Sequence, residues 1–443
     1  MFLFTKWAAA GVALMIGLVV AAGGARPGAP AEEEAYAGWE EVGVGSASGG
    51  GISQTAGMSI GPSLAIDPHG RPVIAWRERT PDNEEIYLRR WNGTTWEELG
   101  GSASGGGVSD THGASDAPSL AIGRDGMPVV AWIEGYHPGL GNVYVRRWNG
   151  QSWVEVSAGS ADGGGIGGQG HAIDPSLAVA PDGTLIVSWS NLIGGQYEVY
   201  AKRWDGLAWK EMGGSASGGG ISDDDNDSMS VSLSIGPDGL PVLAWEARLA
   251  ADDMTTNDEI YLRRWNGDAW VELDGSASGG GVSNTSGYSS RPSLAIGLDD
   301  RLVVAWSDSS QYLYRVYVRG WDGRSRVDIG APFGDETSHD DYGAGSPSLA
   351  VDPNGMPVVA WERSDATRRN LIVWRWNGSA WAEVGNDGVD GTTNAAWPSL
   401  AVARNGRPVL AWYTWLHGVN EEIYVRQHVP LLFPQAFLPV IGQ

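Results

Sequence analysis

Residues 62–99 decide the fold, and they read PSLAIDPHGRPVIAWRERTPDNEEIYLRRWNGTTWEEL. Four short runs rich in Val, Ile, Leu, Tyr and Trp are separated by Gly, Pro, Asn and Asp, which is typical of strands joined by turns. The pair Asn92-Gly93 lies between the last two runs and indicates a hairpin, because a type I′ turn needs positive φ at both central positions. The stretch therefore predicts four short antiparallel strands.

The same unit recurs along the chain with a period near 56 residues, which predicts a repeat architecture. Its Ser stands at Ser63, Ser119, Ser176, Ser232, Ser293, Ser348 and Ser399. Seven four-stranded antiparallel units predict an all-β fold, a seven-bladed β-propeller. The last unit lacks its fourth run, whereas an unmatched Trp39–Val42 run lies near the N-terminus. We expect this N-terminal strand to complete the last blade and close the ring, which removes an exposed edge.

The N-terminal segment predicts export, and the C-terminal segment leaves two interpretations. Residues 1–25 place Lys6 before an apolar run and small residues, the layout of a secretory signal peptide, although an uncleaved membrane anchor is the alternative. We expect a linker at 26–37, the propeller at 38–428 and a hydrophobic tail at 429–443. The tail could associate with a surface or pack on a blade. A secreted or cell-surface protein is expected, with no membrane span in the mature chain.

Composition excludes several classes of function. The 443 residues include no Cys, so disulfides, thiolate metal sites and cysteine nucleophiles are excluded. A net charge of −24 argues against a nucleic-acid partner. Nineteen of the 23 Trp follow the repeat and are expected to fill blade interfaces. Trp374, Trp397 and Trp415 break the repeat, so they are candidate ligand-binding residues. A monomer is expected.

The loop lengths predict which face of the disc carries the functional site. One face carries only tight turns, whereas the other carries the second-to-third-strand loops and the long blade connections. Function on a rigid scaffold tends to lie in variable loops. The working surface is therefore expected on the long-loop face.

Acidic residues after the second-strand Trp are the other candidate ligand-binding residues: Glu78, Glu134, Glu246, Asp308 and Glu362. Their oxygens could hold Ca²⁺, although no calcium-loop spacing is present. They could form a solvated acidic rim, or a pair of them could act as acid and base on a glycosidic bond. No catalytic or metal-ligating residue is assigned, because the sequence carries no nucleophile or metal motif.

The segments WNGTTWEELGGSASGGG and PSLAIGRDGMPVVAW resemble blades of bacterial and fungal propeller lectins, of the fucose-binding and tectonin types. A more distant likeness is to kelch and sialidase-type propellers. The kelch Gly-Gly is absent, and Ser63 and Asp67 are four apart rather than the two of a sialidase box. The lectin resemblance implies sugar pockets between blades, near Trp76, Trp132, Trp245, Trp306 and Trp361.

Together these features favour a secreted, non-catalytic binding module that recognises a glycan or an extracellular protein through the long-loop face and interblade pockets. No cofactor is expected. The first alternative is a propeller-type glycoside hydrolase or lyase, sialidase-like in fold. The second alternative is a purely structural cell-surface scaffold.

Overall fold

The computed structural model describes residues 36–430 apart from 136–140, 169, 249–256, 311–313, 322–324, 330–343, 365–368, 386–387, 390–393 and 415–420. The predicted signal peptide, most of the linker and most of the tail lie outside the described residues, as does Trp415. In the described part, no helix is long and apolar enough to cross a membrane.

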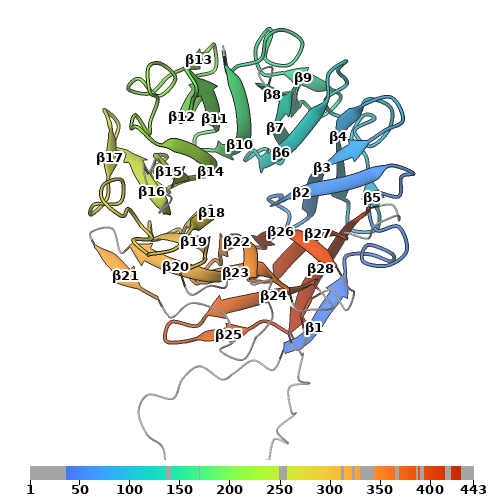
Figure 1. The fold of residues 1–443 in the computed structure, drawn as a ribbon. Helices are drawn as coiled ribbons and strands as arrows, with labels where there is room; N and C mark the ends of the chain where they lie inside the picture. The colour runs from blue at the N-terminus through green and yellow to red at the C-terminus, as the bar shows by residue number, and fades with distance from the viewer. Residues whose placement is uncertain are drawn as a thin grey trace, which may run out of the picture. The chain divides into compact units, whose positions relative to one another are not determined.

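The strands form seven antiparallel sheets of four strands, so the predicted seven-bladed β-propeller is confirmed (Figure 1). Blade 1 consists of β2 (Met58–Ile66), β3 (Pro72–Arg79), β4 (Glu84–Trp91) and β5 (Trp96–Glu97). Blade 2 consists of β6 (Ser115–Ile122), β7 (Pro128–Glu134), β8 (Asn142–Trp148) and β9 (Trp153–Glu155). Blade 3 consists of β10 (His171–Val179), β11 (Leu185–Ile193), β12 (Gln196–Trp204) and β13 (Trp209–Lys210).

Blades 4 to 7 follow the same order. They consist of β14 (Asp227–Ile235), β15 (Pro241–Arg248), β16 (Asp258–Trp265) and β17 (Trp270–Glu272); β18 (Ser289–Ile296), β19 (Leu302–Asp308), β20 (Arg315–Trp321) and β21 (Arg326–Asp328); β22 (Ala344–Val351), β23 (Pro357–Ser364), β24 (Arg369–Trp376) and β25 (Trp381–Glu383); and β26 (Ala395–Val402), β27 (Pro408–Thr414), β28 (Ile423–Pro430) and β1 (Tyr36–Glu41).

The N-terminal strand closes the ring. β1 pairs antiparallel with β28, with Trp39 opposite His428, so the seventh blade contains both ends of the propeller. Trp39 also donates its indole N–H to the Val384 carbonyl of blade 6 at 3.0 Å. The predicted closure is therefore confirmed, and the closing strand also contacts the neighbouring blade.

A ring of hydrogen bonds joins the innermost strands. The hydroxyl oxygen of the repeated Ser accepts the backbone N–H of the Leu that follows the equivalent Ser in the next blade, at 2.9–3.1 Å. The pairs are Ser63–Leu120, Ser119–Leu177, Ser176–Leu233, Ser232–Leu294, Ser293–Leu349, Ser348–Leu400 and Ser399–Leu64. The innermost strand of a blade is a sheet edge, and these bonds satisfy an N–H that the sheet leaves unpaired.

Each innermost strand also carries a bulge, in which two residues oppose the second-strand Trp. The first bulge residue has φ between 50° and 62° in every blade. The second is Pro in six blades and Val231 in the other, which suits a position without a ladder hydrogen bond. We call the first bulge residues the inner ring: Gly61, Ala117, Asp174, Ser230, Arg291, Ser346 and Trp397.

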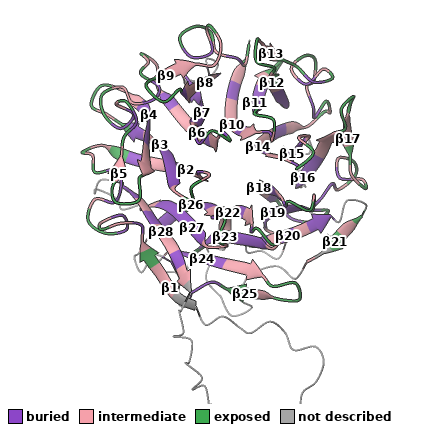
Figure 2. Ribbon diagram, turned by 180° about the vertical axis from the view of Figure 1, so that it is seen from behind, coloured by how far each residue is buried: buried purple, intermediate pink, exposed green. Residues whose placement is uncertain are grey.

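The hydrophobic core lies between the blades. The second-strand Trp residues are almost fully buried, and Trp245, for example, packs on Ile186 and Val199 of the preceding blade. Figure 2 shows buried residues along the strands and exposed residues mainly in the turns. The rings of the second-strand residues Trp76, Trp132, Trp245, Trp306 and Trp361 are at most 3% exposed, so they do not offer a face to the sugar pockets expected near them.

The outer hairpins differ from the predicted type I′ turn. Trp91 pairs with Trp96, so four residues form the loop rather than two. The Asn92 side chain accepts the N–H groups of Thr94 and Thr95, each at 2.9 Å, and Gly93 supplies the positive φ. The Asn is therefore selected for its side-chain hydrogen bonds rather than for its backbone conformation.

Deletion of residues 38–44 tests the closure. We expect the deletion to give aggregation or unfolding, because it exposes the outer edge of β28 and removes the Trp39 contact. Light scattering and thermal melting measure both effects. A deletion of equal length within the linker, residues 28–34, is the control. A monomeric deletion variant with an unchanged melting temperature would contradict the role of β1.

His428 makes closure sensitive to acid. Its imidazole is 1% exposed and packs edge-on against Trp39, and burial, with smaller contributions from Arg375 and Arg407, lowers its pKa to about 4. The unfolded chain binds the proton near pH 6.5 and the folded chain near pH 4, so stability falls as the pH falls through this window. We expect His428→Gln to flatten the dependence of the unfolding free energy on pH between 6.5 and 4. The exposed His69→Gln should leave that dependence unchanged.

Candidate functional site

The five predicted acids divide into two sets by their register after the second-strand Trp. Glu78, Glu134 and Asp308 stand two positions after the Trp and share its face of the sheet. Glu246 and Glu362 stand one position after it and therefore face the opposite side. All five are at most 9% exposed, so the interpretation of a solvated acidic rim is wrong.

The first set belongs to the scaffold. Glu78 accepts hydrogen bonds from Thr55 Oγ1 at 2.7 Å, Ser59 Oγ at 2.5 Å and the Trp76 indole N–H at 3.0 Å. Glu134 repeats this arrangement in blade 2. Asp308 accepts Thr285 and Ser289 hydroxyls, each at 2.7 Å, and its hydrogen bonds together outweigh burial and lower its pKa. These carboxylates tie a blade connection to the blade it enters.

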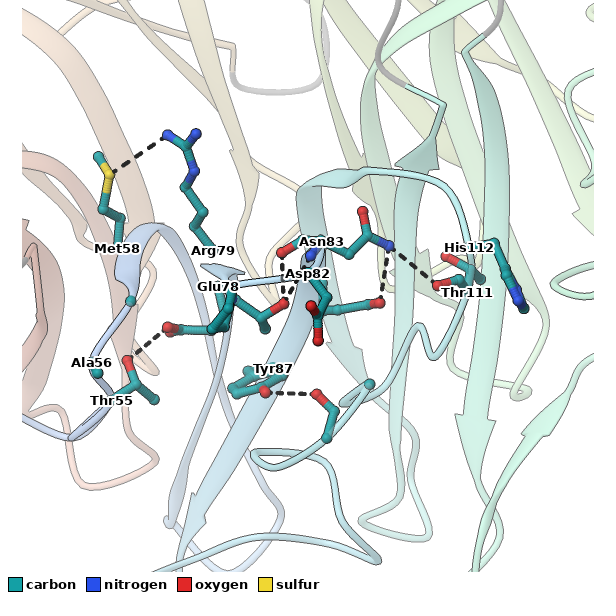
Figure 3. A pocket seen from close by; sticks show the side chains of 16 residues that line it. Thr55, Ala56, Met58, Glu78, Arg79, Asp82, Asn83, Tyr87, Thr111 and His112 are labelled. Carbon is teal, nitrogen blue, oxygen red and sulfur yellow. Dashed lines mark hydrogen bonds between the residues drawn. The ribbon is translucent and has the colours of Figure 1, made fainter.

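A cavity of about 850 Å³ lies beside this scaffold in blade 1 (Figure 3). Two of its three acids, Glu78 and Glu85, already accept hydrogen bonds from neighbouring side chains. Asn83 in its wall donates to Glu85 and to the carbonyl of Gly113, so it joins blade 1 to the next connection. The polar groups of this cavity are thus largely used by the fold.

The second set faces the innermost strand of the next blade. Glu246 Oε2 accepts the Ser230 hydroxyl and the Arg291 backbone N–H, both at 3.3 Å, while its Oε1 lies 3.8 Å from the Arg248 guanidinium. Glu362 Oε1 accepts the Trp397 backbone N–H at 2.6 Å, and its Oε2 lies 3.9 Å from Arg369. Each carboxylate therefore holds the inner-ring N–H of the next blade with one oxygen and faces an arginine with the other.

The two carboxylates are connected through their inner-ring partners. The Arg291 guanidinium lies 5.5 Å from the centre of the Trp397 ring. These residues belong to blades 5 and 7, which are not neighbours, so both side chains reach across the innermost strand of blade 6. Blades 4, 5, 6 and 7 thus contribute to one continuous group around the axis.

A cavity of about 560 Å³ opens at the blade 4 end of this group, and we call it the mouth cavity. It lies at the end of the innermost strands from which the long loops leave. Tyr288 and Tyr314 in its wall are 45% and 46% exposed. The residues lining it are Asp174, Met229, Ser230, Glu246, Arg248, Asp258, Tyr288, Ser290, Arg291 and Tyr314.

Burial shapes the acid–base behaviour of this group. Desolvation raises the pKa of Glu246, Glu362, Asp174 and Asp258 above their usual values, and nearby arginines oppose the shift only in part. Burial and the nearby acids Glu421 and Glu362 raise the pKa of Tyr413 to about 12, so its hydroxyl keeps its proton. Raised carboxyl pKa values suit groups that donate and accept protons.

The predicted Trp candidates differ in their placement. Trp397 is 52% exposed and stands in the inner ring with φ of 52°. Trp374 lies on β24, at the position equivalent to that of Arg89 in blade 1. Its ring centre lies 6.2 Å from that of Trp361. Trp415 lies outside the described residues.

Sequence reasoning missed Asp174, Arg248, Asp258 and Arg291. A signal was present, because residues two positions before the repeated Ser vary from Gly to Trp while the surrounding phrase stays constant. Among the described residues, no group of three or more His, Asp or Glu side chains is arranged to hold a metal ion.

No family model and no curated protein matches the chain. The chain is similar in structure to a polysaccharide lyase, the PL25 ulvan lyase bound to -[GlcA(1-4)Rha3S]-. The TM-score is 0.54 and the identity 12%, over 84% of this chain and 94% of that chain. The α-L-arabinanase of Penicillium chrysogenum gives a TM-score of 0.48 and 15% identity over 84% and 93%. A leech intramolecular trans-sialidase gives 0.41 and 13% over 84% and 67%.

The likeness to the lyase agrees with the propeller fold described above. The expectation of a non-catalytic binding module is contradicted, because the protein that this chain resembles at a TM-score of 0.54 is an enzyme, a polysaccharide lyase. At 12% identity the likeness to the lyase shows the fold alone.

The scaffold role of the first set of acids predicts a stability defect. Glu78→Ala leaves the buried Trp76 N–H and the Ser59 and Thr55 hydroxyls without their acceptor, which should lower the unfolding free energy by about 2–4 kcal/mol. Denaturant unfolding measures this loss. The exposed neighbour Arg79→Ala is the control, and equal stability of the two variants would contradict the scaffold role.

Proposed function

We propose that this chain is a carbohydrate-cleaving enzyme, a glycoside hydrolase or polysaccharide lyase, which acts at the mouth cavity. One observation carries the proposal. Glu246 and Glu362 hold equivalent places two blades apart, and the inner-ring residues that they bind, Arg291 and Trp397, stack on each other. Two carboxyls, a cation and an exposed aromatic ring are therefore linked by successive contacts that run from the mouth cavity to blade 7.

The two carboxyls can divide the proton transfers of bond cleavage. Both kinds of enzyme need an acid that protonates the leaving glycosidic oxygen, and both need a base, which activates water in a hydrolase and removes a proton from carbon in a lyase. Burial raises the pKa of both Glu246 and Glu362, a direction that suits carboxyl groups with a role in proton transfer.

The surroundings suit a sugar chain. Trp397, Tyr288 and Tyr314 are about half exposed, and aromatic faces pack well against the C–H surface of a sugar ring. Ser230 and Ser290 lie in the cavity wall with the tyrosines and provide hydroxyls for hydrogen bonds to the sugar. The fold itself agrees with that of a polysaccharide lyase at a TM-score of 0.54.

The proposal also includes the setting in which such an enzyme would work. Residues 1–25 have the layout of an export signal, so the substrate would be an extracellular glycan. The acidic composition fits a partner other than nucleic acid.

A panel of polysaccharides tests the activity, with reducing ends assayed for all cleavage and ultraviolet absorbance for the unsaturated product of a lyase. We expect Glu246→Gln and Glu362→Gln each to lower kcat by about 100-fold or more, because each removes a proton-transfer group and keeps the shape. The exposed Glu40→Gln on β1 is the matched control. Retained activity in both variants, or no cleavage of any polysaccharide by the unmodified chain, would contradict the proposal.

A further inference from the structure

We infer that Trp397 binds a sugar unit outside the mouth cavity, so that the enzyme cleaves within a long glycan rather than at its end. The inference rests on the proposed function and names the substrate class of the same site. That class comprises polymers and long oligosaccharides, whatever sugar they are built from.

Trp397 is an exposed ring at a place where the other blades carry no aromatic group. The other members of the inner ring are Gly61, Ala117, Asp174, Ser230, Arg291 and Ser346. Trp397 is 52% exposed, whereas the second-strand Trp residues are buried in the blade interfaces. A large apolar side chain left in solvent is informative, because packing of the core does not account for it. The indole ring is therefore available to a ligand.

Two contacts fix the position of this ring. Glu362 Oε1 accepts the Trp397 backbone N–H at 2.6 Å, and the Arg291 guanidinium lies over the ring, 5.5 Å from its centre. A ring that is fixed before binding loses little conformational freedom when a ligand stacks on it. Trp397 thus provides a preformed surface for the C–H face of a sugar ring.

The surface of Trp397 lies beyond the mouth cavity. Trp397 is not among the residues that line the cavity, whereas Arg291, which contacts its ring, is. Glu246 lies in the cavity with the two exposed tyrosines, and Glu362 binds the backbone of Trp397. Aromatic surfaces therefore stand at both ends of the group that carries the two carboxyls. A site that takes only a chain end needs such a surface at one end alone.

The neighbouring blade leaves room beside Trp397. β2 of blade 1 follows β26 around the ring, as the hydrogen bond between Ser399 and Leu64 shows. The inner-ring residue of β2 is Gly61, and a Cβ atom added to Gly61 would meet no atom within 4 Å. The next inner-ring residue is the small Ala117. A glycan chain can therefore continue past Trp397.

Viscosity and reducing ends, measured together on the unmodified full chain, test the inference with three linear polymers: arabinan, xylan and galacturonan. Cleavage within chains lowers the viscosity while few reducing ends have formed, whereas cleavage from the end forms many reducing ends before the viscosity falls. We expect the first behaviour on each polymer that is cleaved. We also expect kcat/KM to be at least about tenfold larger for its octasaccharide than for its tetrasaccharide.

Substitutions locate this preference for length. Trp397→Ala should lower the octasaccharide-to-tetrasaccharide ratio of kcat/KM by about tenfold, and Trp397→Phe should retain part of the ratio. Ala117 already holds the same left-handed backbone, so the alanine variant should fold, and its melting temperature checks this. Gly61→Leu should also lower the ratio, because it fills the open space. Leu298→Ala is the matched control, since Leu298 is 79% exposed on the short-turn face.

The outcomes separate this inference from the enzyme proposal. Cleavage from chain ends, or an unchanged ratio in folded Trp397→Ala, would overturn the inference and leave the enzyme proposal standing. No cleavage of any polysaccharide by the unmodified chain would overturn the enzyme proposal and, with it, the inference.

Discussion

The serine-to-amide hydrogen bonds between adjacent innermost strands are the constraint on which the rest of the propeller depends. A single bond of this kind contributes about 1 kcal/mol, so its importance lies in geometry rather than in strength. Seven such bonds form a closed ring, and a closed ring requires every blade to stand at the same height and tilt. The bulges that follow from this alignment bring seven residues, far apart in sequence, to one level around the axis.

Much of this could be predicted from the sequence, because scaffold residues repeat. The phrase around Ser63, the second-strand Trp and the unmatched run at Trp39 were sufficient for blade number, strand order and closure. The site could not be predicted in the same way, because its residues are those that do not repeat. The acids near the second-strand Trp also stand at two different offsets, so Glu246 at one position after the Trp and Glu78 at two positions face opposite sides of their sheets.

Buried carboxylates therefore have two different roles in this fold. Glu78 is surrounded by hydroxyl and indole donors from its own blade and connection, and these donors fix the position of the carboxylate. Glu362 accepts a backbone N–H of the next blade with one oxygen, and its other oxygen lies 3.9 Å from Arg369. A carboxylate two positions after the second-strand Trp thus stabilises the scaffold, whereas one that stands one position after the Trp is a candidate for proton transfer.

The pairing of β1 with β28 also determines how the propeller can be tethered. Tyr36 lies opposite Pro430, and the direction of β28 places both on the short-turn face. Both described ends of the propeller therefore lie at the face opposite the mouth cavity. A surface joined to the ring at Tyr36 or Pro430 would consequently face away from the cavity, and a long polymer could reach the cavity from the opposite side.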